Sequence, residues 1–218
     1  MKRKPREFAT FREADRWARQ HWPAPGAFSE SERDAIDFYL SDGWALNADL
    51  RAKRALLPQD ERRVQILNAI QSAHPTPEPI IVHRALITST PWRTASGTRV
   101  TERTIWAKRD AVLSAPALEI GFMSTTLGPG PFASRPSRRY PGRHPVPPVW
   151  LRLTVPAGIP ALSVVRFDYP HEHELLLARG LLIQATAMTA VATPLPKDQY
   201  MPGSTVTCTL IDAVVSLP

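Results

Sequence analysis

Apolar side chains recur at helical spacing through the first third of the chain. A first helix is indicated by six of them: Phe8, Phe11, Ala14, Trp17, Ala18 and Trp22. Ser29 and Glu32 have the spacing of a capping box, so a second helix is expected to begin there. Residues 41–43 are expected to end it, followed by a short helix over 46–56 and another from Asp60. Residues 1–75 are thus predicted to form a helical lobe.

From residue 79 the spacing changes to that of strands. Residues 149–155 alternate, and one side carries Val149, Leu151, Leu153 and Val155. Further strands are predicted over 79–86, 174–178, 182–192 and 204–215. Because helices come first and strands follow at short spacing, the sequence predicts an α+β fold rather than alternating βαβ units. We expect a single domain over 1–218, with the helical lobe over 1–75 and a β-rich core over 79–218.

Composition excludes several classes of protein. Hydrophobic residues make up 43% of the 218, which is too many for an intrinsically disordered chain. The single cysteine, Cys208, excludes a disulfide scaffold and a Cys-based zinc finger, and its spacing from Val206 and Leu210 predicts a core position in a strand. No stretch reaches the ~20 consecutive apolar residues of a membrane span, so no membrane partner is expected. No apolar region follows the basic N-terminus, so no secretory signal peptide is expected.

The chain is strongly basic, with 27 Lys and Arg against 20 Asp and Glu and a formal net charge of +7. This balance favours acidic partners, such as a nucleotide, a nucleic acid or an acidic protein face. Part of the charge is concentrated in residues 128–148, where 21 residues hold seven prolines and four arginines. No regular helix or central strand survives this proline density, so we expect a long Pro/Arg-rich surface loop.

Two short segments combine residue types that carry chemistry. Arg84 stands in the otherwise largely apolar run 79–86, where an unpaired charge is expensive to bury. Ser124, Thr125 and Thr126 place three consecutive hydroxyls after an apolar pair. Taken singly, each has a structural interpretation, as a strand ion pair and as an exposed strand end.

A third segment carries paired carboxylates. If residues 172–174 are extended, Glu172 and Glu174 point to the same face, about 6.5–7 Å apart along the chain. Two carboxylates that close raise each other's pKa unless cations or hydrogen bonds compensate. The pair therefore suits a cationic ligand or cationic neighbours, although such a pair alone is usually the solvent face of an edge strand.

In this order, the three segments resemble the motifs of the mono-ADP-ribosyltransferase family. The likeness is to the Arg-Ser-Glu branch, which includes clostridial actin-modifying toxins and related bacterial effectors. Upstream, the aromatic, glycine, aromatic and asparagine that precede the core in that branch correspond to Tyr39, Gly43, Trp44 and Asn47. The resemblance extends from about residue 8 to the last strand. The chain departs from the family in having Ser-Thr-Thr for Ser-Thr-Ser, and in the length and composition of 128–148, which stands where the family's phosphate–nicotinamide loop lies.

The resemblance implies a fold and an activity. The implied fold, ADP-ribosyltransferase-like, is an N-terminal helical lobe packed on two antiparallel sheets, with a cleft for NAD between the sheets. The implied reaction cleaves NAD at the nicotinamide–ribose bond and passes ADP-ribose to an acceptor, through a transition state that resembles an oxocarbenium ion. NAD is then a substrate, and no metal is implied.

The resemblance also assigns roles by motif position. Glu174 is the implied catalytic carboxylate, which hydrogen-bonds the ribose 2′-OH and stabilises the positive charge on the ribose. Ser124 is implied to hold Glu174 and NAD in place. Arg84 contacts the diphosphate, for which a planar guanidinium is suited. Thr125 and Thr126 are expected to shape the nicotinamide pocket.

Further positions concern the acceptor and the rest of the NAD site. In the family a glutamate at the position of Glu172 goes with arginine as acceptor, because a carboxylate can orient a guanidinium and help to remove its proton. Tyr169 is the implied aromatic that meets the acceptor, and His173 is expected to point away from the site. Trp44 and Asn47 are expected to add contacts with NAD.

A zinc hydrolase must also be weighed, because the sequence HEHE at 171–174 resembles a metal motif. The HExxH motif needs a second histidine four residues after the first. Those positions are Leu175, counted from His171, and Leu177, counted from His173. The two histidines could supply two ligands, but no third lies nearby in the sequence, so no metal site is expected.

The basic charge leaves two further functions open. It would suit an ADP-ribosyltransferase whose acceptor is RNA or DNA, or a non-enzymatic basic nucleic-acid-binding module. The combined presence of Arg84, Ser124 and both glutamates disfavours a degenerate, non-catalytic member. We expect the enzyme to act on a protein acceptor in a cytosol, of a host or a target cell, after delivery by a secretion machine or by direct intracellular action. An immunity or inhibitor protein is a further expected partner.

Overall fold

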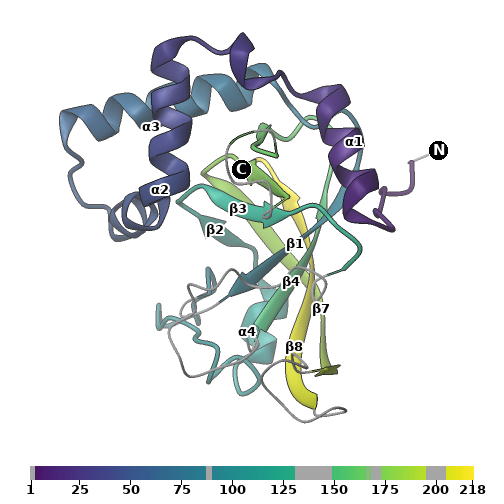
Figure 1. Cartoon of the computed structure of the whole chain (residues 1–218). Helices are drawn as coiled ribbons and strands as arrows, with labels where there is room; N and C mark the ends of the chain where they lie inside the picture. The colour runs from purple at the N-terminus through teal and green to yellow at the C-terminus, as the bar shows by residue number, and fades with distance from the viewer. Residues whose placement is uncertain (1–2, 87–89, 131–148, 166, 168–172, 195–204) are drawn as a thin grey trace.

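Three helices precede the strands, and they gather at one end of the sheet. The computed structural model describes residues 3–86, 90–130, 149–165, 167, 173–194 and 205–218. The helices are α1 (Phe11–His21), α2 (Glu30–Ala52) and α3 (Pro58–Ala73). Figure 1 shows them as an arch over one end of the sheet, whereas the short helix α4 (Arg109–Ser114) lies towards the other end. The α+β class expected from the order of helical and strand patterns is confirmed.

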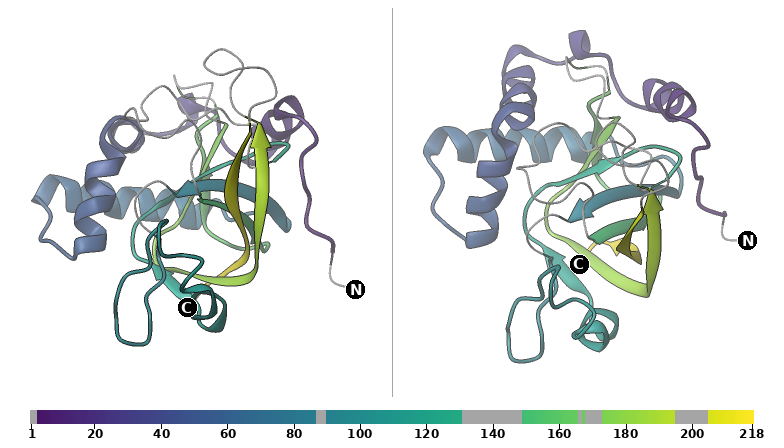
Figure 2. Two further views of the ribbon diagram at one scale, coloured as in Figure 1. Left: turned by 90° about the horizontal axis from the view of Figure 1, so that it is seen from below. Right: turned by 60° about the horizontal axis from the view of Figure 1, so that its bottom comes forward.

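The strands form one hydrogen-bonded sheet, in the order β2-β7-β8-β4-β1-β3-β6-β5. Their bounds are β1 (Ile80–Leu86), β2 (Ala117–Glu119), β3 (Met123–Thr126), β4 (Val149–Val155), β5 (Ala161–Ser163), β6 (Glu174–Leu177), β7 (Leu181–Pro194) and β8 (Thr205–Ser216). Strands β4 and β8 are parallel, and the other pairs are antiparallel. The views in Figure 2 show the long β7 and β8 side by side, curving away from the helices.

This topology differs in two respects from the expected pair of antiparallel sheets. Strand β1 bonds to β4 along its whole length but to β3 at one residue pair, His83 and Thr126. That pair joins β2-β7-β8-β4-β1 to β3-β6-β5, so the two parts are continuous rather than separate. The second difference is the parallel pairing of β4 with β8, which are far enough apart in sequence for a crossover connection.

Helix α2 begins as expected and ends later than expected. Ser29 Oγ accepts the backbone N–H of Glu32, and Glu32 Oε2 accepts the backbone N–H of Ser29, at 3.3 and 2.7 Å, which confirms the capping box. The expected end at residues 41–43 and the separate helix over 46–56 are wrong. The helix continues through Gly43 to Ala52 and ends where Lys53 adopts a left-handed conformation (φ 54°).

The reason is packing at Gly43. A Cβ atom there would lie 2.8 Å from the ring of Tyr39, one turn earlier, so the glycine makes room for the ring and does not stop the helix. Leu46 and Leu50, both buried, continue the apolar face beyond it. The next helix begins at Pro58, two residues before the predicted start at Asp60, and its inward face contains Val64, Leu67 and Ile70 as predicted.

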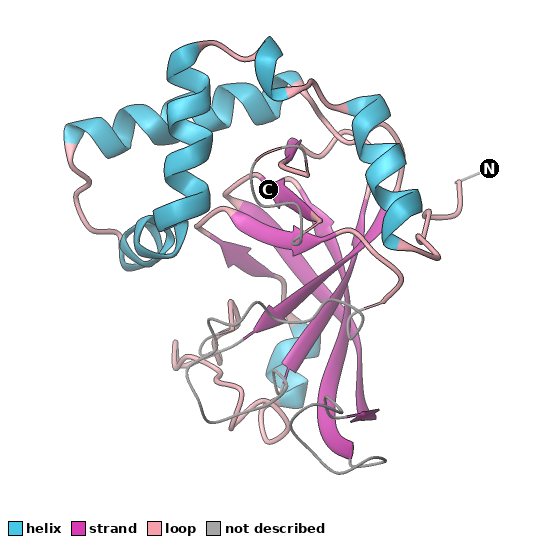
Figure 3. Cartoon of the chain, viewed as in Figure 1, coloured by secondary structure: helices cyan, strands magenta, loops and turns pink. Residues whose placement is uncertain are grey.

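Side chains from the helical region bond to β6, to β5 and to the residue immediately before β3. Asn47 Oδ1 of α2 accepts the backbone N–H of Phe122, next to β3, at 2.7 Å. Gln71 Nε2 of α3 donates to the carbonyl of Leu176 in β6 at 2.8 Å. Trp22 Nε1, at the end of α1, donates to the carbonyl of Ala161 in β5 at 2.9 Å. The helices, drawn cyan in Figure 3, therefore fix the positions of the strands beneath them.

Most strand predictions are confirmed, and β4 has the predicted bounds. The predicted ranges missed several short elements among the described residues: α4, β2, β3 and β5. Cys208 is buried in β8, as its spacing predicted. Residues 131–148 of the Pro/Arg-rich segment lie outside the described residues. Within the described part of the chain, no helix is both long enough and apolar enough to cross a membrane.

Candidate active site

Strands β3 and β6 place the hydroxyl motif beside Glu174. In their antiparallel register, Thr126 lies opposite Glu174 and Ser124 lies opposite Leu176. Residues that lie opposite each other on paired strands share a face of the sheet, as do residues two positions apart along one strand. Ser124, Thr126 and Glu174 therefore share one face. Thr125 points to the other face, where its hydroxyl donates to the carbonyl of Leu175 at 2.6 Å. Thr125 thus ties β3 to β6.

Arg84 of β1 reaches the same place from the neighbouring strand. Its Nη1 donates to the main-chain oxygen of Ser124 at 3.2 Å. Burial, together with the nearby positive charge of Arg51, lowers the pKa of the Arg84 guanidinium, and the carboxylates of Glu119 and Glu174 oppose that shift. An arginine stays charged under such shifts. Arg84, Ser124 and Glu174, which the sequence places far apart, are therefore brought together.

Tyr39 of α2 is a further neighbour of Glu174. Its ring is buried and lies edge-on to Phe122, with ring centroids 5.7 Å apart. Burial raises the pKa of the Tyr39 phenol, and the negative charge of Glu174 raises it further. The phenol is therefore neutral at physiological pH, and its oxygen accepts a hydrogen bond of 3.0 Å from Asn47 Nδ2.

The two α2 residues expected to contact NAD have different surroundings. Asn47 is buried, and its amide bonds to Tyr39 on one side and to the Phe122 backbone on the other. The Asn47 side chain closely approaches the backbone of Gly121, since a Cβ atom on Gly121 would lie 2.6 Å from Asn47 Oδ1. Trp44 is 76% exposed. Its indole is therefore open to a ligand, and the described residues cover little of it.

Arg51 was not among the residues predicted for the site. Its Nε donates to Glu119 Oε1 at 2.8 Å, and within the described residues its buried Nη2 has no hydrogen-bond partner. Arg51 and Arg84 line the same small hollow. A signal was present in the sequence, because Tyr39, Gly43, Asn47 and Arg51 follow one another at four-residue spacing on one side of α2.

His173 points to α1, away from the site, as expected. Its ring stacks on that of Phe11, with centroids 4.3 Å apart and an interplanar angle of 14°. Its Nδ1 lies 2.6 Å from Asp15 Oδ1. The positive φ of His173 (43°) bends the chain immediately before Glu174 enters β6. Tyr169, His171 and Glu172 lie outside the described residues. Across the ranges that the structure describes, no group of three or more His, Cys, Asp or Glu side chains could hold a metal ion.

Comparison with solved structures shows the same fold in bacterial toxins. The C3 exoenzyme of Clostridium limosum is 20% identical, with a TM-score of 0.71 over 98% of each chain. The enzymatic component C2-I of the Clostridium botulinum C2 toxin is 18% identical over 93% of this chain, with a TM-score of 0.69. The ADP-ribosylating toxin BECa of Clostridium perfringens is 15% identical over 97% of this chain, with a TM-score of 0.68.

The chain spans about half the length of C2-I and BECa, 46% and 48% of those chains, and nearly all of the C3 exoenzyme. No curated protein matches the sequence. The model of the ADP-ribosyltransferase exoenzyme family matches residues 12–217, from the first helix to the last strand. That span includes Arg84, Ser124 and Glu174 in the order in which β1, β3 and β6 bring them together. The chain belongs to the ADP-ribosyltransferase exoenzyme family.

Proposed function

We propose that the protein is a mono-ADP-ribosyltransferase that takes ADP-ribose from NAD, releases nicotinamide and modifies an arginine of a protein acceptor. The observation that carries this proposal is the convergence of Arg84, Ser124 and Glu174 across three adjacent strands. Membership of the ADP-ribosyltransferase exoenzyme family supports the reaction class. The BECa toxin, which has the same fold, has been solved with NADH, a close relative of the proposed donor.

The two guanidiniums of the site suit a dinucleotide diphosphate. Arg84 and Arg51 line one hollow, and the buried Nη2 of Arg51 has no partner within the described residues. A buried charged donor without a partner is costly, and a phosphate oxygen would satisfy it. Glu119 already bonds Arg51 Nε, which holds this guanidinium in place. In this proposal Arg84 and Arg51 bind the donor through its diphosphate.

The burial and strand position of Glu174 support its assignment to the ribose. It is 5% exposed and lies on the sheet face shared with Ser124 and Thr126. Fixed negative charge in a water-poor site stabilises positive charge that develops on the ribose when nicotinamide leaves. Ser124 would orient the donor beside Glu174, and Thr126 would border the nicotinamide pocket. Thr125 supports both strands through its bond to the Leu175 carbonyl.

Residues of α2 complete the donor side. Asn47 is assigned as a positioning residue, because its amide holds the Tyr39 hydroxyl and the Phe122 backbone beside the site. The Asn47 amide nitrogen can donate two hydrogen bonds, and in this proposal the second goes to NAD, as the resemblance implies. Trp44 would add a contact through its exposed indole.

The acceptor side is assigned to the segment before β6. Glu172, two residues before Glu174, would orient the acceptor guanidinium and receive its proton as the nitrogen attacks the ribose carbon. Tyr169 would contact the acceptor protein. The net charge of +7 also supports a nucleic-acid acceptor, and the experiment below distinguishes the two.

The test is transfer of label from labelled NAD to acceptors in a cell lysate. The wild-type protein should label acceptors and release nicotinamide, and Glu174→Gln should lose about 100-fold or more in rate, because the developing charge is no longer opposed. Glu61→Gln, an exposed change in α3, is the matched control. The proposal fails if the wild-type protein neither labels acceptors nor hydrolyses NAD, and Glu174→Gln is indistinguishable from it.

A second variant tests the acceptor assignment. Glu172→Gln should abolish transfer to arginine while NAD hydrolysis continues at a reduced rate, because the donor-side residues are intact. Mass spectrometry of the modified acceptors gives the linkage. Label that is removed by protease and resists nucleases identifies a protein acceptor. Label that is removed by RNase or DNase would show that the acceptor is a nucleic acid and would contradict the protein assignment.

A further inference from the structure

The hollow beside Arg84 contains more positive charge than a diphosphate needs. Among the described residues, four arginines line it, namely Arg51, Arg84, Arg93 and Arg99, together with one carboxylate, Glu119. Glu119 is engaged with Arg51 at 2.8 Å. Within the described part of the chain, neither Arg93 nor Arg99 forms an ion pair. The two phosphates of NAD carry one negative charge each, so a dinucleotide of this kind leaves the hollow positive.

Arg93 and Arg99 face each other across a small, ordered hairpin. They form an antiparallel bridge, and Trp92 and Val100 flank it, both buried. Like charges opposite each other in an antiparallel pair are destabilising. The hairpin nevertheless holds them there, with the Arg93 guanidinium bonded to the Gly97 carbonyl at 3.0 Å. A bound anion would offset the repulsion that this arrangement creates.

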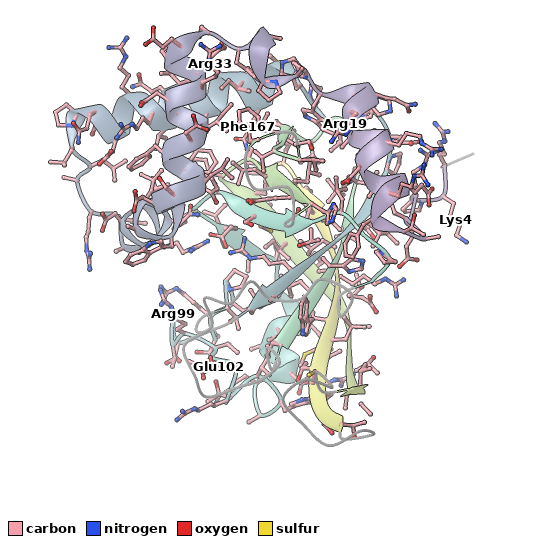
Figure 4. All side chains as sticks on the ribbon, viewed as in Figure 1. Lys4, Arg19, Arg33, Arg99, Glu102 and Phe167 are labelled. Carbon is pink, nitrogen blue, oxygen red and sulfur yellow. The ribbon has the colours of Figure 1, made fainter. Side chains whose placement is uncertain are left out.

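The arrangement along the hollow indicates which part of a ligand meets this pair. Arg84 donates to the main chain of Ser124 in β3, which pairs with the strand that carries Glu174, where the proposed function places the ribose that loses nicotinamide. The same hollow is lined by Leu118 of β2, which is 50% exposed, and by Pro91 of the hairpin segment. Apolar surface beside cationic groups suits the adenosine half of a dinucleotide. Figure 4 shows Arg99 on the segment that projects beside β2, far from Arg19 of α1.

We propose that Arg93 and Arg99 form a subsite for the 2′-phosphate of an adenosine, so that the enzyme accepts NADP as a donor as well as NAD. A phosphate monoester carries a charge of about −1.5 to −2 at neutral pH, so it would neutralise the positive charge that the diphosphate leaves in the hollow. Guanidiniums bind phosphate bidentately, and the pair presents two of them on one hairpin. This inference rests on the proposed function.

The bonds that change with NADP are those of the proposed reaction. The nicotinamide–ribose C–N bond breaks, and its electron pair leaves with nicotinamide. The acceptor nitrogen bonds to the same ribose carbon and loses a proton, and the transferred group is ADP-ribose with a phosphate on the adenosine ribose. No oxidant or reductant takes part, because the nicotinamide ring is released without gaining hydride.

Binding of nucleotide fragments tests the subsite without relying on turnover. In isothermal titration calorimetry, 2′,5′-ADP should bind the protein about tenfold or more tightly than AMP, since it adds a doubly charged phosphate. Arg99→Ala and Arg93→Ala should each remove most of that preference. Arg103→Ala, an exposed arginine on the same segment that does not line the hollow, should keep it. Equal affinity for 2′,5′-ADP and AMP in the folded wild-type protein would overturn the inference.

Donor use separates this inference from the proposed function. Wild-type protein should release nicotinamide from both NAD and NADP, and Arg99→Ala should raise the KM for NADP about tenfold more than the KM for NAD. If the enzyme turned over NAD but not NADP, the proposed subsite would be wrong and the proposed function would stand. If the enzyme released nicotinamide from neither donor, the proposed function would be wrong. The calorimetry would still test the subsite. Arg99-dependent binding of an RNA oligonucleotide that 2′,5′-ADP does not displace would assign the arginines to nucleic acid instead.

Discussion

His83 is a buried titratable group next to Arg84 that the proposed reaction does not use. Its side chain is 1% exposed, and its strand partners are Thr126 in β3 and Arg152 in β4. Burial lowers the pKa of His83 to about 4, the positive charge of Arg152 contributes, and the backbone at Gly128 opposes the shift. The imidazole is therefore neutral at physiological pH, at the pairing that joins β1 to β3.

The lowered pKa predicts a loss of stability in mild acid. The unfolded chain binds a proton on His83 below pH ~6.5, whereas the folded protein binds it near pH 4, so the free energy of unfolding falls as pH falls between these values. Over the whole interval, this shift in the pKa of His83 lowers the free energy of unfolding by about 3 kcal/mol. In urea unfolding from pH 7 to pH 4, His83→Gln should flatten this dependence. His21→Gln, an exposed histidine of α1, should not, and equal slopes for wild type and His83→Gln would contradict the prediction.

The residues of the candidate site differ in how far the sequence could predict them. Arg84, Ser124 and Glu174 could be predicted because their three motifs, taken in order, resemble those of the ADP-ribosyltransferase family, although each motif alone has a structural interpretation. Arg51 was missed. Its four-residue spacing from Asn47 places it on the same side of α2, but its place at the site depends on an ion pair with Glu119, 68 residues away. The fit of Asn47 between Tyr39 and Gly121 likewise depends on contacts between separate elements.

Helix α2 shows where local signals mislead. A serine, an aspartate and a glycine in succession usually mark a turn, so the sequence predicted a helix end at residues 41–43. In the structure the helix passes through Gly43, because the missing side chain leaves room for the ring of Tyr39. The preference of glycine for turns is a property of its own backbone. Here tertiary packing of Tyr39 beside Glu174 decides the outcome.

Gly43→Ala should therefore destabilise the protein, although alanine favours helices by about 1 kcal/mol. The new Cβ would lie 2.8 Å from Tyr39 Cε2, and the ring is held by burial and by Asn47. Overpacking of this kind costs about 1–3 kcal/mol. We expect a lower Tm and a reduced rate of nicotinamide release, measured beside Asp42→Ala, an exposed neighbour. A rise in Tm for Gly43→Ala would show that the ring moves aside freely.

The molecule as a whole relies on its helices to hold the strands of the site. Strands β3, β6 and β5 join the longer strands through one residue pair of β1 and β3, so their pairing alone fixes them weakly. Asn47, Gln71 and Trp22 add bonds from three points of the helical region. The alternation of residues predicts such strands but not their neighbours, because register depends on contacts between distant parts of the chain. That residues 1–218 form one domain stays a prediction.

Gln71 gives a test of this dependence. It is fully buried in α3, and its Nε2 donates to the carbonyl of Leu176, two residues after Glu174 in β6. Gln71→Ala would leave that carbonyl without its partner, at a cost of about 1–3 kcal/mol in the free energy of unfolding. Because β6 carries Glu174, we also expect kcat for nicotinamide release to fall more than KM rises. Gln65→Ala, an exposed change in the same helix, should alter neither. A stable Gln71→Ala protein with wild-type kcat would show that β6 keeps its position without the helix.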